Sequence, residues 1–271
     1  MSPTRTRRPG FTPIQLIVLL GLLLVGAALL APIVSRIRAA AAQAQTQNNL
    51  KQLALGTINL TDTYRGMLPP VAGAFPNPKK DAEWGTVHFF MLPYIEQAPL
   101  YQKAATDQPG EYSPWRNGVA ATPVTIYADP QDTSAPPQFV YKGWLATTSY
   151  PCNYLVFKDG TNRFPQSIPD GTSNTLMFAQ RYQMCNGNPT AWGYADLYYW
   201  TPTFGYYSTD KFQSAPSADA CDPTRPQSIG SGSIQTAFCD GSARSISSRI
   251  PSVMWYYLTD PADGNAINFD F

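Results

Sequence analysis

The sequence predicts an α+β fold, in which a long N-terminal helix packs against an antiparallel sheet. Three observations favour this fold class. An uncharged apolar run from Ile14 to Val34 continues directly into an amphipathic stretch, residues 35–61. The rest of the chain, residues 62–271, contains short β-like runs separated by turn signals. A helix followed by a series of strands is typical of an α+β domain, because an α/β domain alternates the two.

The apolar run has the length of a membrane span. Its 21 residues, Ile14 to Val34, rise about 31 Å as a helix, close to the ~30 Å hydrocarbon core of a bilayer. Three arginines, Arg5, Arg7 and Arg8, precede the run, and positive charge favours the cytoplasmic side of a membrane. We therefore expect a single-pass membrane protein whose N-terminus is cytoplasmic and whose later residues are exported.

A cleaved signal peptide is the alternative interpretation of this run. The apolar region of a signal peptide is usually ~7–15 residues long, which is shorter than the run found here. Pro32 is poorly suited to cleavage after Ala31, whereas a cut after Ala39 or Ala41 stays open. Such a cut would release a soluble domain.

Residues 35–61 predict a continuation of the same helix that packs on the exported domain. Leu50, Leu53, Ala54 and Ile58 recur at the spacing of one helical face. The alanines of residues 39–42 favour a helix by their intrinsic propensity. The polar residues between them can point away from that face.

The sequence of the exported domain, residues 62–271, predicts one short helix and several strands. The helix is expected at Thr86 to Leu92, after a region broken by glycine and proline. Asp240-Gly241 lies between two alternating runs, as a β-hairpin requires. The expected strands lie in VTIYA, FVYKGWL, YLVF, TLMFAQRY, the aromatic block Leu197 to Tyr207, and SIQTAF.

The composition argues against nucleic acid as a partner. The chain has 19 Lys and Arg and 18 Asp and Glu, with a formal net charge of +1. Binding to phosphates needs a concentrated basic surface, and the only basic cluster is the N-terminal tip.

Four cysteines lie in the exported part: Cys152, Cys185, Cys221 and Cys239. An even number in an oxidising compartment permits two disulfides, with three possible pairings. Free buried cysteines are the alternative. A zinc site is not expected, because no CxxC spacing occurs and His88 is the only histidine.

The N-terminal segment RRPGFTPIQLIVLL resembles the cleavage and methylation signal of type IV pilins and type II secretion pseudopilins. In those families a prepilin peptidase cuts after a glycine and methylates the next phenylalanine. The resemblance implies cleavage between Gly10 and Phe11, a leader of residues 1–10, and a transmembrane stem of residues 11–34. It implies two kinds of partner, the prepilin peptidase and other pilin-like subunits.

Four further blocks are similar to the signatures of a bacterial prepilin-like family, domain of unknown function 1559. They are NNLKQLALGTINLTDTYRGMLPP, MLPYIEQAPLY, IPDGTSNTLMFAQR and AFCDGSARSIS, in the family's order. The resemblance implies a pilin-like fold, anchored in the inner membrane, with its head in the periplasm or at the cell surface.

The chain departs from these families at several polar positions. Pro13 and Gln15 stand where leucine and glutamate are usual. That glutamate is thought to pair with the free N-terminus of a neighbouring subunit, so Gln15 is the position that we associate with assembly. Three other departures follow from the resemblance. Gly230 stands where a histidine is usual, Ala128 to Pro130 where a Cys-Pro-Ser block is usual, and Gln180 where a glutamate is usual.

No catalytic set is visible, and we expect no enzyme. A Ser-His-Asp triad would have to use His88, which lies in a bulky apolar segment. No phosphate-binding loop and no G-x-S-x-G elbow occurs. Glu83, Glu96 and Glu111, the only glutamates, have no spacing that suggests a glycosidase pair.

Two binding hypotheses remain. Asp219, Asp222 and Asp240 offer oxygen ligands for Ca²⁺, although short acidic side chains also cap turns. No other cofactor is expected. The second hypothesis is carbohydrate or surface recognition by exposed aromatics, although strands commonly bury such residues. The candidates are Tyr198, Tyr199, Trp200, Phe204, Tyr206, Tyr207, Trp255, Tyr256 and Tyr257.

The sequence thus predicts a structural subunit, or a minor component, of a pilus-like or secretion-type filament. The alternative is a membrane-tethered binding module that never polymerises and presents its head to a surface ligand. The uncharged Gln15 favours this alternative.

Overall fold

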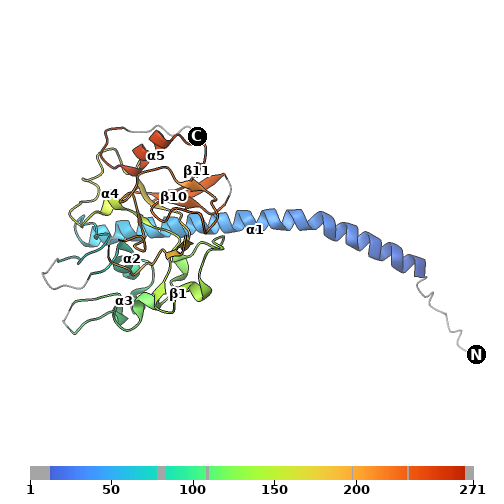
Figure 1. Cartoon of the computed structure of the whole chain (residues 1–271), viewed down its shortest axis with the longest axis horizontal. Helices are drawn as coiled ribbons and strands as arrows, with labels where there is room; N and C mark the ends of the chain where they lie inside the picture. Colours follow the sequence, from blue (N-terminus) through green and yellow to red (C-terminus); the bar gives the residue numbers. More distant parts are fainter. Residues whose placement is uncertain (1–12, 78–83, 108–109, 197, 231, 266–271) are drawn as a thin grey trace, which may run out of the picture. The chain divides into compact units, whose positions relative to one another are not determined.

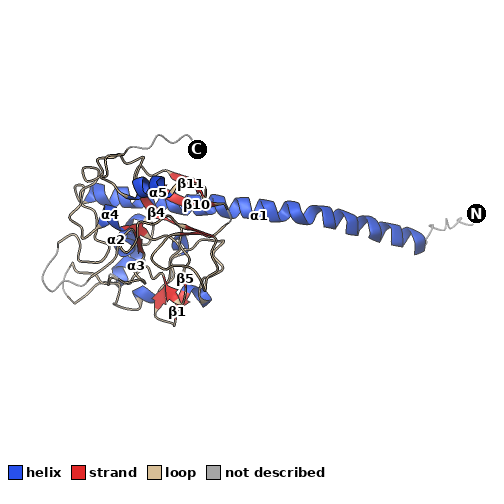
Figure 2. Cartoon of the chain, turned by 45° about the horizontal axis from the view of Figure 1, so that its top comes forward, coloured by secondary structure: helices blue, strands red, loops and turns tan. Residues whose placement is uncertain are grey.

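The computed structural model describes residues 13–77, 84–107, 110–196, 198–230 and 232–265, with the backbone alone for residues 23–32 (Figure 1). The chain divides into two compact units, Met1–Ala42 and Gln43–Phe271. Most of the second unit is loop, and its strands are short (Figure 2).

Helix α1 (Pro13–Thr63) runs without interruption for 51 residues, through part of both units. Within the second unit, Leu50, Leu53 and Ala54 are fully buried and Ile58 is half-buried. The expected apolar face is therefore confirmed. It is extended by buried polar residues, among them Thr46 and Thr57, which the sequence did not single out.

The helix ends in a left-handed turn. Gly66 has φ +83° and its N–H donates to Thr61 O at 2.7 Å. A Cβ at Gly66 would lie 2.9 Å from Phe164 O, so a larger residue fits neither the backbone conformation nor the space.

The main sheet has five strands in the order β11-β10-β4-β3-β7. Strands β4 (Leu176–Ala179), β10 (Ser233–Phe238) and β11 (Ala243–Ser247) pair antiparallel, and β3 (Cys152–Asn153) pairs antiparallel with β4. Strand β7 (Thr203–Phe204) lies parallel to β3. The α+β class is confirmed, but the sheet is mixed. Parallel pairing needs a long crossover, which the intervening chain supplies.

The Asp240-Gly241 hairpin is confirmed between β10 and β11. Ser242 N donates to Asp240 Oδ1 at 2.8 Å, and Gly241 has φ +84°. The turn pairs Ser233 with Ser247 at the far end of the hairpin.

The two faces of the sheet are covered by different helices. On one face, α1 residues Leu50 and Leu53 share a core cluster with Phe178 and Ala237. On the other, Ile234 and Phe238 pack in a cluster with Trp255 and Leu258 of α5 (Ser252–Thr259). The alternation of Ala237 and Phe238 between the two clusters follows from the two-residue period of a strand.

The expected helix at Thr86 to Leu92 is confirmed as α2 (Val87–Met91), followed by the 3-10 turn η1 (Leu92–Tyr94). Thr86 caps it, because its Oγ1 accepts from Phe89 N at 3.1 Å.

Shorter elements lie outside the main sheet. They are α3 (Ala98–Lys103), η2 (Val119–Ala121), η4 (Pro137–Phe139) and the strands β1 (Val140–Tyr141), β2 (Leu145–Ala146), β5 (Met184–Cys185), β6 (Asn188–Pro189), β8 (Gln213–Ser214) and β9 (Gln227–Ser228).

Two of the expected strands are helical turns. YLVF is α4 (Tyr154–Phe157), and VTIYA contains η3 (Thr125–Tyr127). Asn153 explains the first difference, since its Oδ1 accepts from Leu155 N at 3.0 Å and caps a helical turn. Among the described residues of the aromatic block, 198–207, only Thr203 and Phe204 form a strand.

Candidate functional site

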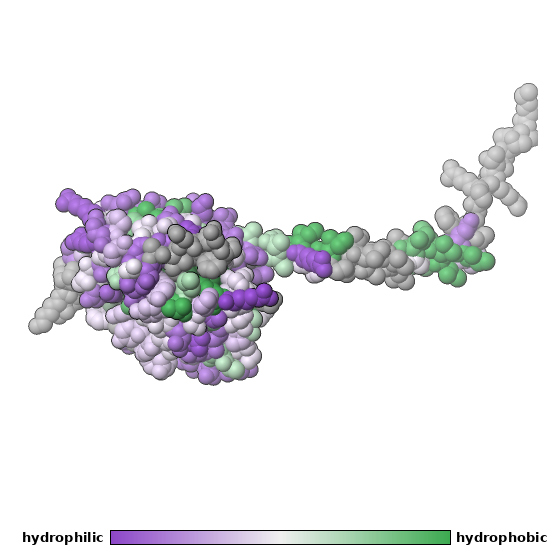
Figure 3. Space-filling model, turned by 90° about the horizontal axis from the view of Figure 1, so that it is seen from above, coloured by the Kyte–Doolittle hydropathy of each residue, from purple (hydrophilic) through white to green (hydrophobic). Residues whose placement is uncertain are grey.

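The residues expected to direct processing and assembly lie at the start of the chain. Gly10 and Phe11 are outside the described residues. Gln15 lies in the first turn of α1 and is exposed, among exposed apolar residues that appear green in Figure 3. Where the structure describes the helices, none has a stretch long and apolar enough to cross a membrane.

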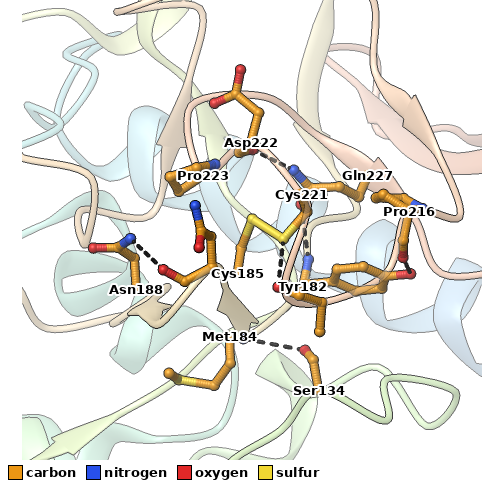
Figure 4. Close-up of a disulfide and its surroundings, with 12 residues drawn as sticks. Ser134, Tyr182, Met184, Cys185, Asn188, Pro216, Cys221, Asp222, Pro223 and Gln227 are labelled. Atoms are coloured by element: carbon orange, nitrogen blue, oxygen red, sulfur yellow. Dashed lines mark hydrogen bonds between the residues drawn. A yellow bond between two sulfur atoms is a disulfide. The ribbon is translucent and has the colours of Figure 1, made fainter.

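The four cysteines comprise one disulfide and two free thiols. Cys185 and Cys221 are joined, with Cα atoms 5.6 Å apart (Figure 4). The disulfide is partly enclosed by Tyr182, whose hydroxyl donates to Pro216 O at 2.7 Å. Cys152 and Cys239 are free and buried. Burial raises the pKa of the Cys152 thiol to about 12, so this thiol stays protonated at neutral pH.

Two of the three aspartates considered for Ca²⁺, Asp222 and Asp240, cap turns. Asp222 Oδ1 accepts from the N–H and the hydroxyl of Thr224, at 2.9 and 2.7 Å. Asp240 forms an ion pair with Arg244 at 3.0 Å, and Asp219 is exposed. Among the described residues, no group of three or more His, Cys, Asp or Glu side chains is placed to hold a metal ion.

His88 is fully buried in the core. Its Nε2 lies 2.8 Å from Tyr150 O, and its ring packs edge-on against Tyr127 and Phe178. Burial lowers the pKa of His88 to about 4, so the ring is neutral at physiological pH.

A buried polar cluster joins α1 to the sheet. Asp129, which is 2% exposed, accepts hydrogen bonds from Thr46 Oγ1 at 2.9 Å and from Gln180 Nε2 at 2.6 Å. Nearby, Asp132 accepts from Ser149 Oγ at 3.0 Å, and burial raises the pKa of Asp132. Each donor fills an acceptor site, so the cluster holds the helix in register with the sheet.

A second buried polar group anchors the loops around β7. The Arg181 guanidinium is buried and donates to Thr203 O at 2.7 Å, to Thr201 O at 2.9 Å and to Pro223 O at 3.1 Å. Burial lowers the pKa of Arg181 to about 10, which leaves it charged at neutral pH.

The structure divides the candidate aromatics between core and surface. Phe204 and Trp255 are buried, and Trp200 and Tyr257 are half-buried. The exposed members are Tyr198, Tyr199, Tyr206, Tyr207 and Tyr256.

Four of these exposed tyrosines, Tyr198, Tyr199, Tyr206 and Tyr207, join rings from other segments in one continuous surface. Tyr198 contacts Trp200, with ring centroids 6.0 Å apart, and Trp200 lies 6.2 Å from Trp144. Trp144 in turn stacks on Trp115 at 6.4 Å. We call this surface the aromatic ribbon and define it by ten residues: Trp115, Tyr141, Trp144, Tyr154, Tyr194, Tyr198, Tyr199, Trp200, Tyr206 and Tyr207.

Half of the ribbon was not predicted from the sequence. The five residues concerned come from several segments of the chain, and no local spacing links them to the tyrosines of residues 198–207; they are Trp115, Tyr141, Trp144, Tyr154 and Tyr194. The only signal in the sequence for these residues was the abundance of tryptophan and tyrosine in segments expected to be loops.

Hollows occur elsewhere on the second unit. One of about 530 Å³ lies between α1 and η1, where Gly56, Asn59 and Tyr94 line it. Another of about 470 Å³ lies along the edge strand β11, between Arg244, Arg249 and Phe238.

Comparison with known proteins identifies the family. No curated protein and no solved structure matches the chain. A family model described as "Protein of unknown function (DUF1559)" matches residues 35–252, which includes α1 from Ser35 onward and the whole main sheet. The chain therefore belongs to the DUF1559 family, as the four sequence blocks predicted.

Proposed function

We propose that the chain is a pilin-like structural subunit, or a minor component, of a cell-surface or type II secretion-type filament. The observation that carries this proposal is helix α1, which packs in the core of an α+β head in the second unit and whose residues 13–42 belong to the first unit. In the first unit large apolar side chains such as Ile14, Ile17 and Leu22 are exposed, so another apolar surface has to cover them.

In the proposed mechanism, the inner membrane covers this segment first. The prepilin peptidase then removes residues 1–10 and methylates Phe11, and the stem moves from lipid into the core of a filament. There the stems of neighbouring subunits pack laterally, because apolar helices exchange lipid contacts for contacts with one another. Gln15 provides a hydrogen-bonding group in the stem without the cost of a buried charge.

The first test is the intact mass and N-terminal residue of the protein recovered from membranes. The proposal expects a chain that begins at methylated Phe11. A chain that begins at Met1 or Ser2 would keep the arginine-rich tip and could not leave the membrane. A start beyond Ala31 would remove the stem and overturn the proposal.

The second test is cross-linking through the stem. A photoreactive residue at Ile17, which is exposed on α1, should give a ladder of multimers in cells, and the same residue at Asp62 in the head serves as the control. Monomers alone from Ile17 would refute a filament.

Isolated monomers would favour the second candidate function, a membrane-tethered binding module that does not polymerise. The aromatic ribbon is the observation that favours this candidate, because large exposed aromatic surfaces mark binding sites. The two functions differ in what the stem does, because it packs against other stems in the first and stays in the membrane in the second.

A further inference from the structure

We propose that the aromatic ribbon is a binding surface for a neutral polysaccharide. This inference goes beyond the filament proposal, because it concerns the head and holds whether or not the stems assemble.

The ribbon is continuous and exposed. From Trp115 the ring contacts lead through Trp144, Trp200, Tyr198 and Tyr199, and then reach Tyr207 at 5.0 Å. Contacts of 4.7 and 4.6 Å extend it through Tyr206 to Tyr154. Six of its residues are exposed, with relative exposures between 37% and 46%. This is a row of rings, which suits an extended chain better than a single small molecule.

The centre of the ribbon is held in place by contacts within the protein. Trp200 Nε1 donates to Asn188 Oδ1 at 3.1 Å, and the rings of Tyr141 and Tyr194 pack on Trp200. Beneath them lies a small buried cluster that includes Leu145 and Ala191. Because these three central rings are already packed, binding on them loses little side-chain entropy.

The chemistry of the ribbon fits sugars. A pyranose ring has an apolar face of C–H groups, which packs on an aromatic ring, and hydroxyls at its edge, which need hydrogen-bonding partners. Seven of the ten ribbon residues are tyrosines, whose hydroxyls donate and accept. Tyrosine therefore meets both requirements with one side chain.

The charge around the ribbon favours an uncharged polymer. Lys142 lies over the Tyr141 ring, with its Nζ 5.1 Å from the centroid, and Asp196 accepts from the Tyr194 hydroxyl at 3.5 Å. These two groups have opposite signs. An anionic polysaccharide or an anionic lipid surface would instead need a basic cluster.

The test is affinity electrophoresis of the full-length protein in detergent, with neutral polysaccharides in the gel. Hydroxyethyl cellulose, xylan, galactomannan and dextran are the probes, and alginate is the anionic comparison. We expect at least one neutral polymer to slow the protein. Trp144→Ala and Tyr198→Ala should each raise the apparent Kd by roughly tenfold, the loss of about one ring contact. Trp84→Ala is the matched control, because Trp84 is 51% exposed and lies outside the ribbon.

Several results would overturn the proposal. Unchanged mobility in every neutral polymer would do so, as would equal losses in the Trp144→Ala and Trp84→Ala variants. Binding to alginate alone, abolished by salt, would point to charge instead of ring stacking. Concentration-dependent self-association that Trp144→Ala abolishes would make the ribbon a protein interface. Circular dichroism of each variant separates lost binding from lost folding.

Discussion

Replacing Gln180 by glutamate tests the buried polar cluster between α1 and the sheet. Gln180 is 1% exposed, its Nε2 donates to Asp129 Oδ2 at 2.6 Å, and its Oε1 accepts from Gln235 N at 2.8 Å. Glutamate retains the acceptor for Gln235. It has a hydrogen to donate to Asp129 only when it is protonated.

The loss of stability in this variant follows from the free energy needed to keep the glutamate protonated. In the Gln180→Glu variant the two carboxyl groups are in contact and share one proton. Keeping a proton on a carboxyl with an unfolded pKa of ~4.3 costs about 1.4 kcal/mol per pH unit, or about 3.7 kcal/mol at pH 7. This value is an upper limit, because the pair ionises when ionisation costs less. The folded pKa of the new glutamate is raised, so stability is full below about pH 4.3 and decreases as pH rises.

The assay is urea unfolding of the full-length protein in detergent, followed by tryptophan fluorescence at about pH 5 and about pH 7.5. We expect the destabilisation relative to wild type to grow by roughly 3 kcal/mol between these values. The double variant Asp129→Asn with Gln180→Glu restores a donor and should remove most of the pH dependence. The same loss at both pH values in the single variant would refute the shared-proton reasoning.

Three further predictions concern the core, the disulfide and the histidine. Leu53→Ala should lower the free energy of unfolding by about 2–5 kcal/mol, because Leu53 is fully buried. Leu55 is 41% exposed on the same helix, so Leu55→Ala should lower it by about 1 kcal/mol or less. Urea titration compares the two variants, and equal losses would contradict the burial pattern. Replacing Cys185 and Cys221 by serine should lower it by about 2–4 kcal/mol, because the disulfide links residues 36 apart. A reductant should then destabilise wild type and leave the variant unchanged. His88 should show no titration by NMR between about pH 5.5 and 8, because its pKa is lowered to about 4. Since the unfolded chain takes up the proton first, the free energy of unfolding decreases as pH falls from about 6.5 towards 4. An NMR titration midpoint near pH 6.5 would show instead that the ring is hydrated.

Regular local patterns made part of the fold predictable. The spacing of Leu50, Leu53 and Ala54 gave the buried face of α1, and the Asp240-Gly241 pair gave the β10–β11 hairpin. Both signals act over a few residues, so the sequence shows them directly. The buried Thr46 and Thr57 escaped notice because polar residues are usually expected to face solvent.

Non-local pairing was not predictable. Strand β7 joins β3 in parallel across about 50 residues of mostly irregular chain, and neither strand is longer than two residues. A run of four apolar residues such as Tyr154–Phe157 fits a strand or a helical turn equally well, and the Asn153 cap decides between them. The aromatic ribbon is non-local in the same way, since folding alone brings Trp115 beside Trp144.

Two positions that the family resemblance marks as departures are in contact in the structure. The resemblance implies a Cys-Pro-Ser block at Ala128 to Pro130 and a glutamate at position 180, and in this chain the side chains of Asp129 and Gln180 are hydrogen-bonded although 51 residues separate them. Glutamate at 180 would place a second buried carboxyl against Asp129, whereas glutamine supplies the donor that Asp129 needs. The presence of Asp129 is therefore a physical reason for glutamine at 180. The two positions, which look independent in the sequence, form one hydrogen-bonded pair that connects α1 to the sheet through Thr46.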